Sequence, residues 1–244
     1  MTEQGVLVPP VAHTNNIRTW MRRWVAAWRV ADGCGTSSGL THRTLWLETG
    51  ERLFVSVWFL GFVYRMSAGF LDAPNVIVLL LVVSEALPFL YIVLRLPSAT
   101  LSQRPTDWCF GILGSVLPLL VLPAVSATPL VHVPVCFGIM VVGMSLQVMA
   151  KLILGCSFGI VAANRGVRVL GPYRFIRHPM YAGYTITHVG FLLAMPSPVN
   201  ALIYATALTM QVARIFREER LLGQDAGYRE FAGHVRYRLV PGIF

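Results

Sequence analysis

A short basic segment, RHPMY at residues 177–181, combines residue types that suit the binding of an anion. Pro179 fits the first turn of a helix, and His178 before it is biased away from the helical region and can act as the N-cap. A helix that begins there presents free amide groups and the positive end of its dipole. Arg174 and Arg177 add positive charge beside it. The segment therefore predicts a site for a carboxylate or a phosphate group.

A second polar segment, ARIFREERLL at 213–222, supplies acidic groups. Arg214 and Glu218 are four residues apart, so a helix places both side chains on one face. Glu219 extends the acidic group by one residue. This spacing predicts a helix that carries an arginine and a pair of carboxylates near its end.

Two apolar runs, 181–195 and 199–213, connect these polar segments and flank the sequence PSP. Each run is short for an independent membrane span, so together they predict a helical hairpin. A hairpin returns the chain to the side on which it started, and we therefore expect Glu218 and Glu219 to lie near His178. A zwitterionic ligand with a carboxylate, an ammonium group and a ribose would find partners there. The alternative is a structural role, in which the loop is joined to a cytoplasmic helix by salt bridges.

The remaining elements must hold this site in a membrane. The chain has 244 residues, of which 55% are hydrophobic and 13% are charged, a composition typical of membrane proteins. A helix needs roughly 20 apolar residues to cross a bilayer. Runs of about this length occupy 53–71, 75–94, 108–127 and 130–150. The sequence predicts an all-α, polytopic integral membrane protein with about five to six transmembrane helices and a C-terminal cofactor site at the cytoplasmic face.

Basic residues predict the orientation, because lysine and arginine collect in cytoplasmic loops. They precede the first span and follow the second, the fourth and the last, whereas the connections at 72–74, 128–129 and 196–198 contain none. Both termini are therefore expected in the cytoplasm, at a bacterial inner membrane or at the endoplasmic reticulum. The formal charge of +9 is spread over these loops and matches no nucleic-acid-binding module.

Three regions follow from this pattern. Residues 1–52 are predicted to form a cytoplasmic arm with an interfacial amphipathic helix, since NIRTWMRRWVAAWRVA places aromatic and basic residues on opposite faces. Residues 53–150 are predicted to form a four-helix transmembrane region. Residues 151–244 are predicted to form the catalytic region with the hairpin.

Polar residues inside the spans need partners, because an ionisable group in lipid is costly. We expect Arg65 and Glu85 to pair between adjacent helices, and Gln147, His132 and His188 to form interhelical hydrogen bonds. A direct role of the Arg65–Glu85 pair in substrate binding is the alternative. The four cysteines lack paired metal-binding spacing, so no metal site is predicted.

The motifs LGCSFGI, GPYRFIRHPMYAGY, EERLL and YREFAGHVRYRLVP occur in this order over residues 150–241. This part of the chain resembles the isoprenylcysteine carboxyl methyltransferases and their relatives, the membrane phospholipid and thiol methyltransferases. The resemblance implies a membrane-embedded methyltransferase that uses S-adenosyl-L-methionine. Its acceptor would be a lipophilic small molecule or a lipidated substrate that approaches through the membrane lipids, with a carboxylate of a prenylcysteine or isoprenoid-like compound as the leading analogy.

The resemblance also implies which residues form the site. Arg214 matches the arginine associated with the methyl acceptor, and His178 is the other catalytic candidate. If the acceptor is a thiol or an amine, His178 or Glu219 would take its proton. The residues expected at the cofactor are Arg165, Gly166, Val167, Arg168, Tyr173, His178, Pro179, Met180, Tyr181, Glu218 and Glu219. At 165–168 the chain has RGVR where the prenylcysteine enzymes usually have His-Thr-Leu-Val.

Two other functions fit part of the pattern. The membrane sterol and enone reductases use NADPH and have a related C-terminal segment, but with RHPNYxGE, where this chain has Met180 and Tyr184 in place of Asn and Glu. A non-enzymatic membrane scaffold or transporter is the third interpretation. The clustering of polar residues at one end of the spans, rather than along a path, favours an enzyme.

Overall fold

The computed structural model describes residues 42–72, 74–94, 105–124, 126–154 and 169–244. Within these ranges the regular elements are helices, which confirms the all-α prediction. Residues 1–41 of the predicted arm and the segment 155–168, with the predicted site residues Arg165, Gly166, Val167 and Arg168, lie outside the described residues, whereas the end of the predicted arm, from His42, belongs to the first described helix. The elements are α2 (His42–Asp72), α3 (Val76–Leu94), α4 (Pro105–Val116), η1 (Leu117–Leu120), α5 (Val133–Leu154), η3 (Gly171–Arg174), α6 (Pro179–Ala194), α7 (Pro198–Leu222) and α8 (Ala226–His234).

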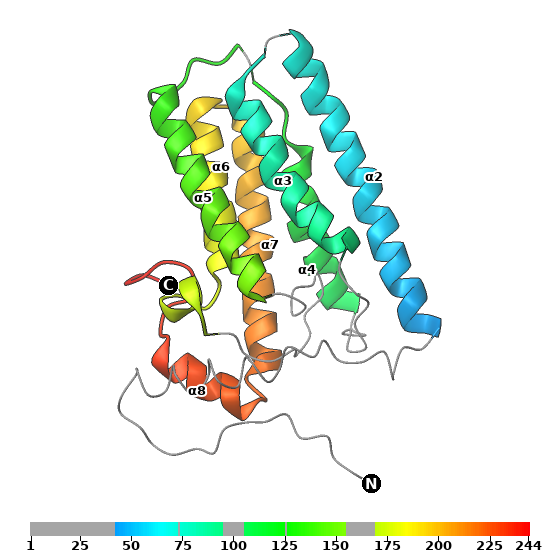
Figure 1. Ribbon diagram of the computed structural model, residues 1–244, viewed down its shortest axis with the longest axis vertical. Helices are drawn as coiled ribbons and strands as arrows, with labels where there is room; N and C mark the ends of the chain where they lie inside the picture. The colour runs from blue at the N-terminus through cyan, green and yellow to red at the C-terminus, as the bar shows by residue number, and fades with distance from the viewer. Residues whose placement is uncertain (1–41, 73, 95–104, 125, 155–168) are drawn as a thin grey trace.

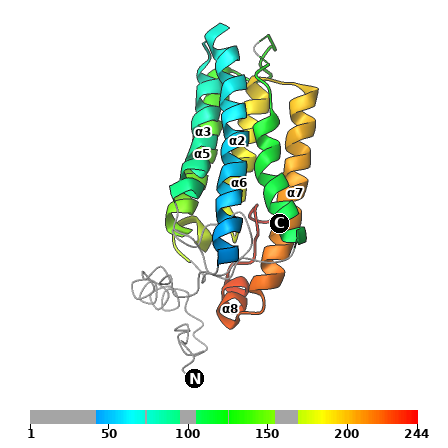
Figure 2. The same ribbon diagram turned by 90° about the vertical axis from the view of Figure 1, so that its right-hand side faces the viewer.

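The long helices form a bundle whose members run side by side along the longest axis of the molecule (Figure 1). Helix α5 packs most extensively on α6, α4 packs on α7, and α2 packs on α3. Helix α8 lies beyond one end of the bundle, below the last turns of α7, as both views show (Figure 2). The predicted hairpin is confirmed, because α6 and α7 flank the PSP sequence and Ser197 caps α7 by accepting from the Asn200 amide.

Glycines bring α5 and α6 into close contact. A Cβ atom on Gly143 would lie 2.5 Å from the Thr187 hydroxyl, and one on Gly183 would lie 2.7 Å from the Gln147 amide nitrogen. A Cβ on Gly190 would meet Met140 at 2.7 Å. Small residues at these points let two helix backbones approach, which is a common way of packing helices in membranes. Helix α6, which begins with the RHPMY segment, is thereby fixed against α5.

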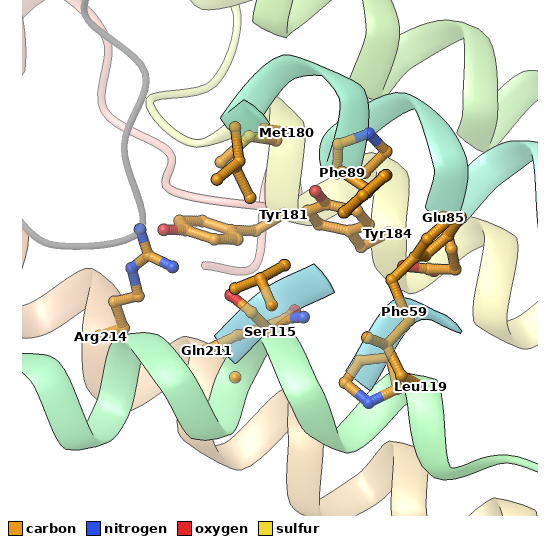
Figure 3. Close-up of a pocket in the computed structure, with 15 residues that line it drawn as sticks. Phe59, Glu85, Phe89, Ser115, Leu119, Met180, Tyr181, Tyr184, Gln211 and Arg214 are labelled. Atoms are coloured by element: carbon orange, nitrogen blue, oxygen red, sulfur yellow. The ribbon is translucent and has the colours of Figure 1, made fainter. Parts of the chain in front are cut away.

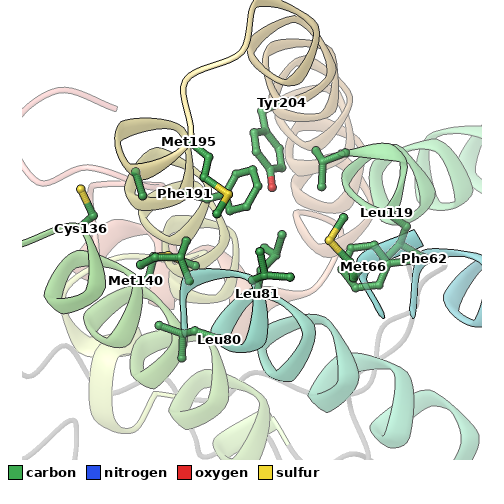
Figure 4. Close-up of a cluster of buried hydrophobic side chains, with 14 of the residues drawn as sticks. Phe62, Met66, Leu80, Leu81, Leu119, Cys136, Met140, Phe191, Met195 and Tyr204 are labelled. Carbon is green, nitrogen blue, oxygen red and sulfur yellow. The ribbon is translucent and has the colours of Figure 1, made fainter. Parts of the chain in front are cut away.

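The bundle interior is apolar at the end opposite α8. Figure 4 shows side chains of α2, α3, η1, α5, α6 and α7 meeting there. The cluster includes Phe62, Met66, Leu81, Met140 and Phe191, each with at most 1% of its surface exposed. Dense packing of this kind gives the bundle a defined arrangement on which the polar groups can be positioned.

Polar groups inside the bundle bond across helices, as expected for Gln147. Its amide nitrogen donates to the Ser84 hydroxyl at 2.8 Å, which links α5 to α3. The predicted pair of Arg65 and Glu85 is wrong, because the Arg65 guanidinium donates to the carbonyl oxygen of Leu119 instead. The 3-10 turn of η1 leaves the Leu119 carbonyl free to accept a hydrogen bond, and this carbonyl takes the place of the carboxylate as the partner of the guanidinium. The sequence does not reveal that this carbonyl is available.

The predicted span at 108–127 is broken. Helix α4 ends at Val116, and η1 leads into extended backbone at Val121. Pro118 explains this break, because proline lacks the amide hydrogen that a continuing α-helix needs. The last apolar run and the polar segment after it form one helix, because α7 runs from Pro198 to Leu222, and this confirms the predicted helix around Arg214 and Glu218.

The bundle is that of an integral membrane protein. Among the described residues, three helices are long and apolar enough to cross a bilayer, namely α3, α5 and α7, and Trp108–Leu120 is a shorter apolar helix. Large apolar side chains also point outward, as Leu53, Val57 and Leu60 do on α2. A water-facing surface would make these side chains unfavourable, whereas acyl chains accommodate them. The total of five to six crossings and the cytoplasmic placement of the termini stay predictions.

Candidate functional site

The start of α6 is held by the segment that follows α8. The amide of Arg177 donates to the Tyr237 carbonyl at 2.9 Å, and the amide of His178 donates to the Arg238 carbonyl at 2.9 Å. His178 occupies the N-cap position and Pro179 begins the helix, as predicted. The imidazole does not cap the helix, however, because no side-chain capping bond forms. It is therefore available to face the end of α7.

Glu219 is the centre of a charged cluster that joins α6, α7 and the C-terminal segment. Its Oε1 accepts from Arg177 Nη1 at 2.9 Å and lies 3.4 Å from His178 Nε2. Its Oε2 accepts from Arg238 Nε at 2.7 Å. Arg177 also donates to the carbonyl oxygens of Val235 and Arg236, at 2.7 and 3.0 Å. Three of the roughly four acceptor positions of the carboxylate are thus in use, and these contacts favour a structural role for Glu219.

Glu218 points to the other side of the same imidazole. Its Oε1 accepts from the Tyr181 hydroxyl at 3.0 Å and from Arg214 Nε at 2.8 Å. Its Oε2 lies 3.9 Å from His178 Nδ1. The expected convergence of His178 with both carboxylates is therefore present, and the predicted residues Tyr181 and Arg214 join it. His178 itself is 8% exposed, so it meets these charges away from bulk water.

A cavity opens beside this cluster, between α2, α3, α4, α6 and α7 (Figure 3). It contains about 640 Å³ of unfilled space, counting the part open to the exterior. Figure 3 shows Arg214 and the Tyr181 hydroxyl facing each other at one end of it. The walls are mostly apolar and include Phe59, Phe89 and Leu119. The charged end and the apolar body suit a ligand that has a polar head and a lipophilic remainder.

The other predicted cofactor residues lie around this cluster. Met180 lines the cavity, and Pro179 is buried at the first turn of α6. Tyr173 is buried behind the start of α6, where its hydroxyl donates to the Ala150 carbonyl at 3.4 Å. Burial raises the pKa of Tyr173, so the phenol stays neutral. Arg174 is exposed and takes no part in the cluster.

Some residues of the site were missed by the sequence reasoning. Arg238 bonds Glu219, and both Tyr184 and Gln211 line the cavity. Helical spacing could have indicated two of them, because Tyr184 is three residues after Tyr181 and Gln211 is three residues before Arg214. Arg238 carried no such signal, since its position depends on how the chain folds back after α8.

A comparison with known families matches part of the chain. Residues 133–225 match the model of a family described as phospholipid methyltransferase. This segment is therefore similar to that family of membrane methyltransferases. The match confirms the resemblance, although it starts earlier than expected, at the first residue of α5, and stops before α8. No curated protein matched the chain.

The methyltransferase segment includes every residue of the cluster except Arg238. It also contributes the cavity side chains of α6 and α7, whereas the opposite wall comes from α2, α3 and α4, which precede the match. The polar end of the cavity therefore belongs to the family segment, and much of its apolar body is built by the part of the chain outside it.

Proposed function

We propose that the protein is an S-adenosyl-L-methionine-dependent methyltransferase of the membrane that acts on a carboxylate of a lipophilic acceptor, of prenylcysteine or isoprenoid-like type. The observation that carries this proposal is the shared position of Tyr181 and Arg214. Both line the apolar cavity and both hold Glu218. A water-soluble cofactor at the carboxylate and a lipophilic acceptor in the cavity would then meet at these two side chains.

The residues at the start of α6 fit the polar groups of such a cofactor. The first turn has no side-chain cap, so its amide groups and the helix dipole favour a carboxylate there. Glu218 can accept from an ammonium or a ribose hydroxyl, and its side chain retains 17% exposure. His178, between Glu218 and Glu219, would form one wall of the site.

When bound, the cofactor supplies an electrophilic methyl carbon on a sulfonium. The protein then has to align the acceptor with that carbon at near-attack distance and exclude water. Arg214 would orient the acceptor carboxylate, and the apolar walls would hold the remainder of the molecule. A carboxylate oxygen needs no general base to attack, so in this proposal His178 binds and positions and does not transfer a proton.

The competing proposal is an NADPH-dependent membrane reductase, and direct binding distinguishes the two. Purified protein in detergent is titrated by calorimetry with S-adenosyl-L-methionine and, separately, with NADPH. Saturable binding of the first and none of the second is expected. The reverse result would contradict the methyltransferase proposal.

The acceptor class needs a second experiment. Membranes that contain the protein are incubated with donor carrying a radiolabelled methyl group, and the lipid-extractable product is treated with mild base. A methyl ester releases its label as methanol, whereas a methylated amine or thioether does not. Label that resists base would show that the acceptor atom is not a carboxylate oxygen.

A further inference from the structure

A second polar cluster lies within the membrane-spanning part of the bundle and reaches the other end of the cavity through Glu85. It consists of Glu85 on α3, His188 on α6 and Tyr204 on α7. Glu85 lines the cavity, and its Oε1 lies 3.7 Å from His188 Nε2. The His188 ring stacks on the Tyr204 ring with their centroids 4.1 Å apart. Figure 3 shows Glu85 across the cavity from Arg214, with Tyr181 and Tyr184 between them.

Each member of this cluster has a buried polar atom without a hydrogen-bond partner among the described residues. These atoms are Glu85 Oε1, His188 Nε2 and the Tyr204 hydroxyl. The three residues are between 5% and 7% exposed. Leaving one such group unpaired is unfavourable, and three together are unusual in a folded protein. Glu85 lines the cavity, and His188 Nε2 lies 3.7 Å from its Oε1, so this grouping indicates that a ligand binds at this end of the cavity.

The two ends of the cavity therefore offer different chemistry. Arg214 and Tyr181 form the first end, and Glu85, backed by His188, forms the second. Between them the walls are apolar, with Phe59, Phe89 and Leu119 among the lining residues. A ligand with a single polar head would satisfy the first end and leave the second unpaired.

We propose that the Glu85–His188–Tyr204 cluster binds a hydroxyl group of the methyl acceptor. The acceptor would then be an elongated lipophile with a carboxylate at one end and a hydroxyl at the other. A hydroxyl both donates and accepts, so it can pair with a carboxylate oxygen and with an imidazole nitrogen. It is also uncharged, and bringing a charged group into the membrane-spanning region would be costly. This inference rests on the proposed function, because it assigns the substrate class of the same cavity.

Binding of matched probes tests the inference without knowledge of the natural acceptor. The affinities of dodecanoate and ω-hydroxydodecanoate are measured by calorimetry on the whole protein in detergent, with S-adenosylhomocysteine present. Shorter and longer members of both series are included, so that the chain length is matched to the cavity. We expect the hydroxy acid to bind about 3- to 10-fold tighter at the best length, as one well-placed hydrogen bond provides.

Variants show whether Glu85 causes this preference. Glu85→Leu should remove it and leave the affinity for dodecanoate nearly unchanged. Ser115→Ala is the matched control, because Ser115 also lines the cavity but its hydroxyl already donates to the Gly111 carbonyl at 2.9 Å. The control should keep the preference. If Glu85→Leu does not fold, His188→Phe is used in its place. This variant keeps an aromatic ring stacked on Tyr204 but lacks the ring nitrogen, so it should also reduce the preference.

Three results would overturn the inference. The wild-type protein could bind both acids equally at every length, which would mean that only water satisfies the cluster. The preference could survive Glu85→Leu, which would place the hydroxyl elsewhere. A stronger gain with ω-aminododecanoate would make the cluster a cation site. Each of these results concerns only the hydroxyl site, and the proposed function stands if the protein still binds the methyl donor and transfers its methyl group. A wild-type protein that does not bind the donor would refute the proposed function itself.

Discussion

Glu218 and Glu219 are adjacent in α7, yet their contacts predict opposite consequences when each is replaced by glutamine. Glu219 is bonded by Arg177 and Arg238, which hold the C-terminal segment against the start of α6. Glu218 is bonded by two residues that line the cavity, Tyr181 and Arg214. Glu219→Gln should therefore lower stability, and Glu218→Gln should lower cofactor affinity.

The size of the stability loss follows from the bonds. Glu219 accepts from two guanidinium groups at 2.9 and 2.7 Å, and its side chain is 11% exposed. Hydrogen bonds to charged groups contribute about 1.5–3 kcal/mol each. Glutamine keeps one acceptor oxygen, turns a donor toward the other guanidinium and removes the charge. We expect a loss of about 2–3 kcal/mol, which lowers the midpoint of thermal unfolding by roughly 5–10 °C for a chain of this size.

Glu218→Gln should behave differently. Its remaining oxygen can still accept from Tyr181 and Arg214, so the loss of stability is expected to be smaller, at about 1 kcal/mol. Loss of a charge-assisted bond to the cofactor should weaken its binding about 10- to 100-fold.

Thermal unfolding and calorimetric titration with S-adenosyl-L-methionine, on both variants below their unfolding midpoints, measure the two effects. Folded Glu219→Gln should bind within about threefold of the wild type, since three-fold corresponds to only about 0.7 kcal/mol. The reasoning is refuted if Glu218→Gln binds normally, or if Glu219→Gln loses binding while its unfolding midpoint is unchanged.

Three further changes test other parts of the structure. Gly183→Ala places a Cβ 2.7 Å from the α5 backbone and should cost about 1–3 kcal/mol, measured by thermal unfolding. Gly138→Ala in α5 meets nothing within 4 Å and should not destabilise, with a gain of up to about 1 kcal/mol from helix propensity. Tyr181→Phe removes only the bond to Glu218 and should reduce cofactor affinity about 3- to 10-fold in a titration; a larger loss of stability than of affinity would make the hydroxyl structural. The Asn200 side chain donates to the Leu122 carbonyl at 2.7 Å and accepts from the Leu122 amide at 3.1 Å. Asn200→Leu removes both bonds and should lower the free energy of unfolding by about 2–4 kcal/mol, measured in a denaturation series. An unchanged midpoint would show that these bonds do not stabilise the backbone after η1.

The sequence alone determined the class of the protein and one end of its site. Length and hydropathy predict helices in a membrane, because only backbone that satisfies its own hydrogen bonds can cross lipid. The hairpin at 181–213 could be predicted because two apolar runs flank a proline-containing turn, and it brings His178 to Glu218 and Glu219. Proline at position 179 and the four-residue spacing of Arg214 and Glu218 are local features, so they needed no knowledge of the remaining chain.

Tertiary structure decided what each of these residues contacts. The sequence treats Glu218 and Glu219 alike, but successive residues of a helix point about 100° apart. Glu218 therefore meets Tyr181 and Arg214, which line the cavity, whereas Glu219 meets Arg177 and Arg238. The partners of Arg65 and Glu85 were mispredicted for a related reason, because adjacency of two helices does not fix their rotation or their relative height.

The cavity could not be predicted, since it is bounded by α2, α3, α4, α6 and α7 and exists only where their packing leaves space. The cluster of Glu85, His188 and Tyr204 depends in the same way on three helices that are far apart in the sequence. Local patterns specify helices, ends and faces, because those depend on near neighbours along the chain. Which faces meet is decided by side-chain packing over the whole bundle, and that packing creates the site.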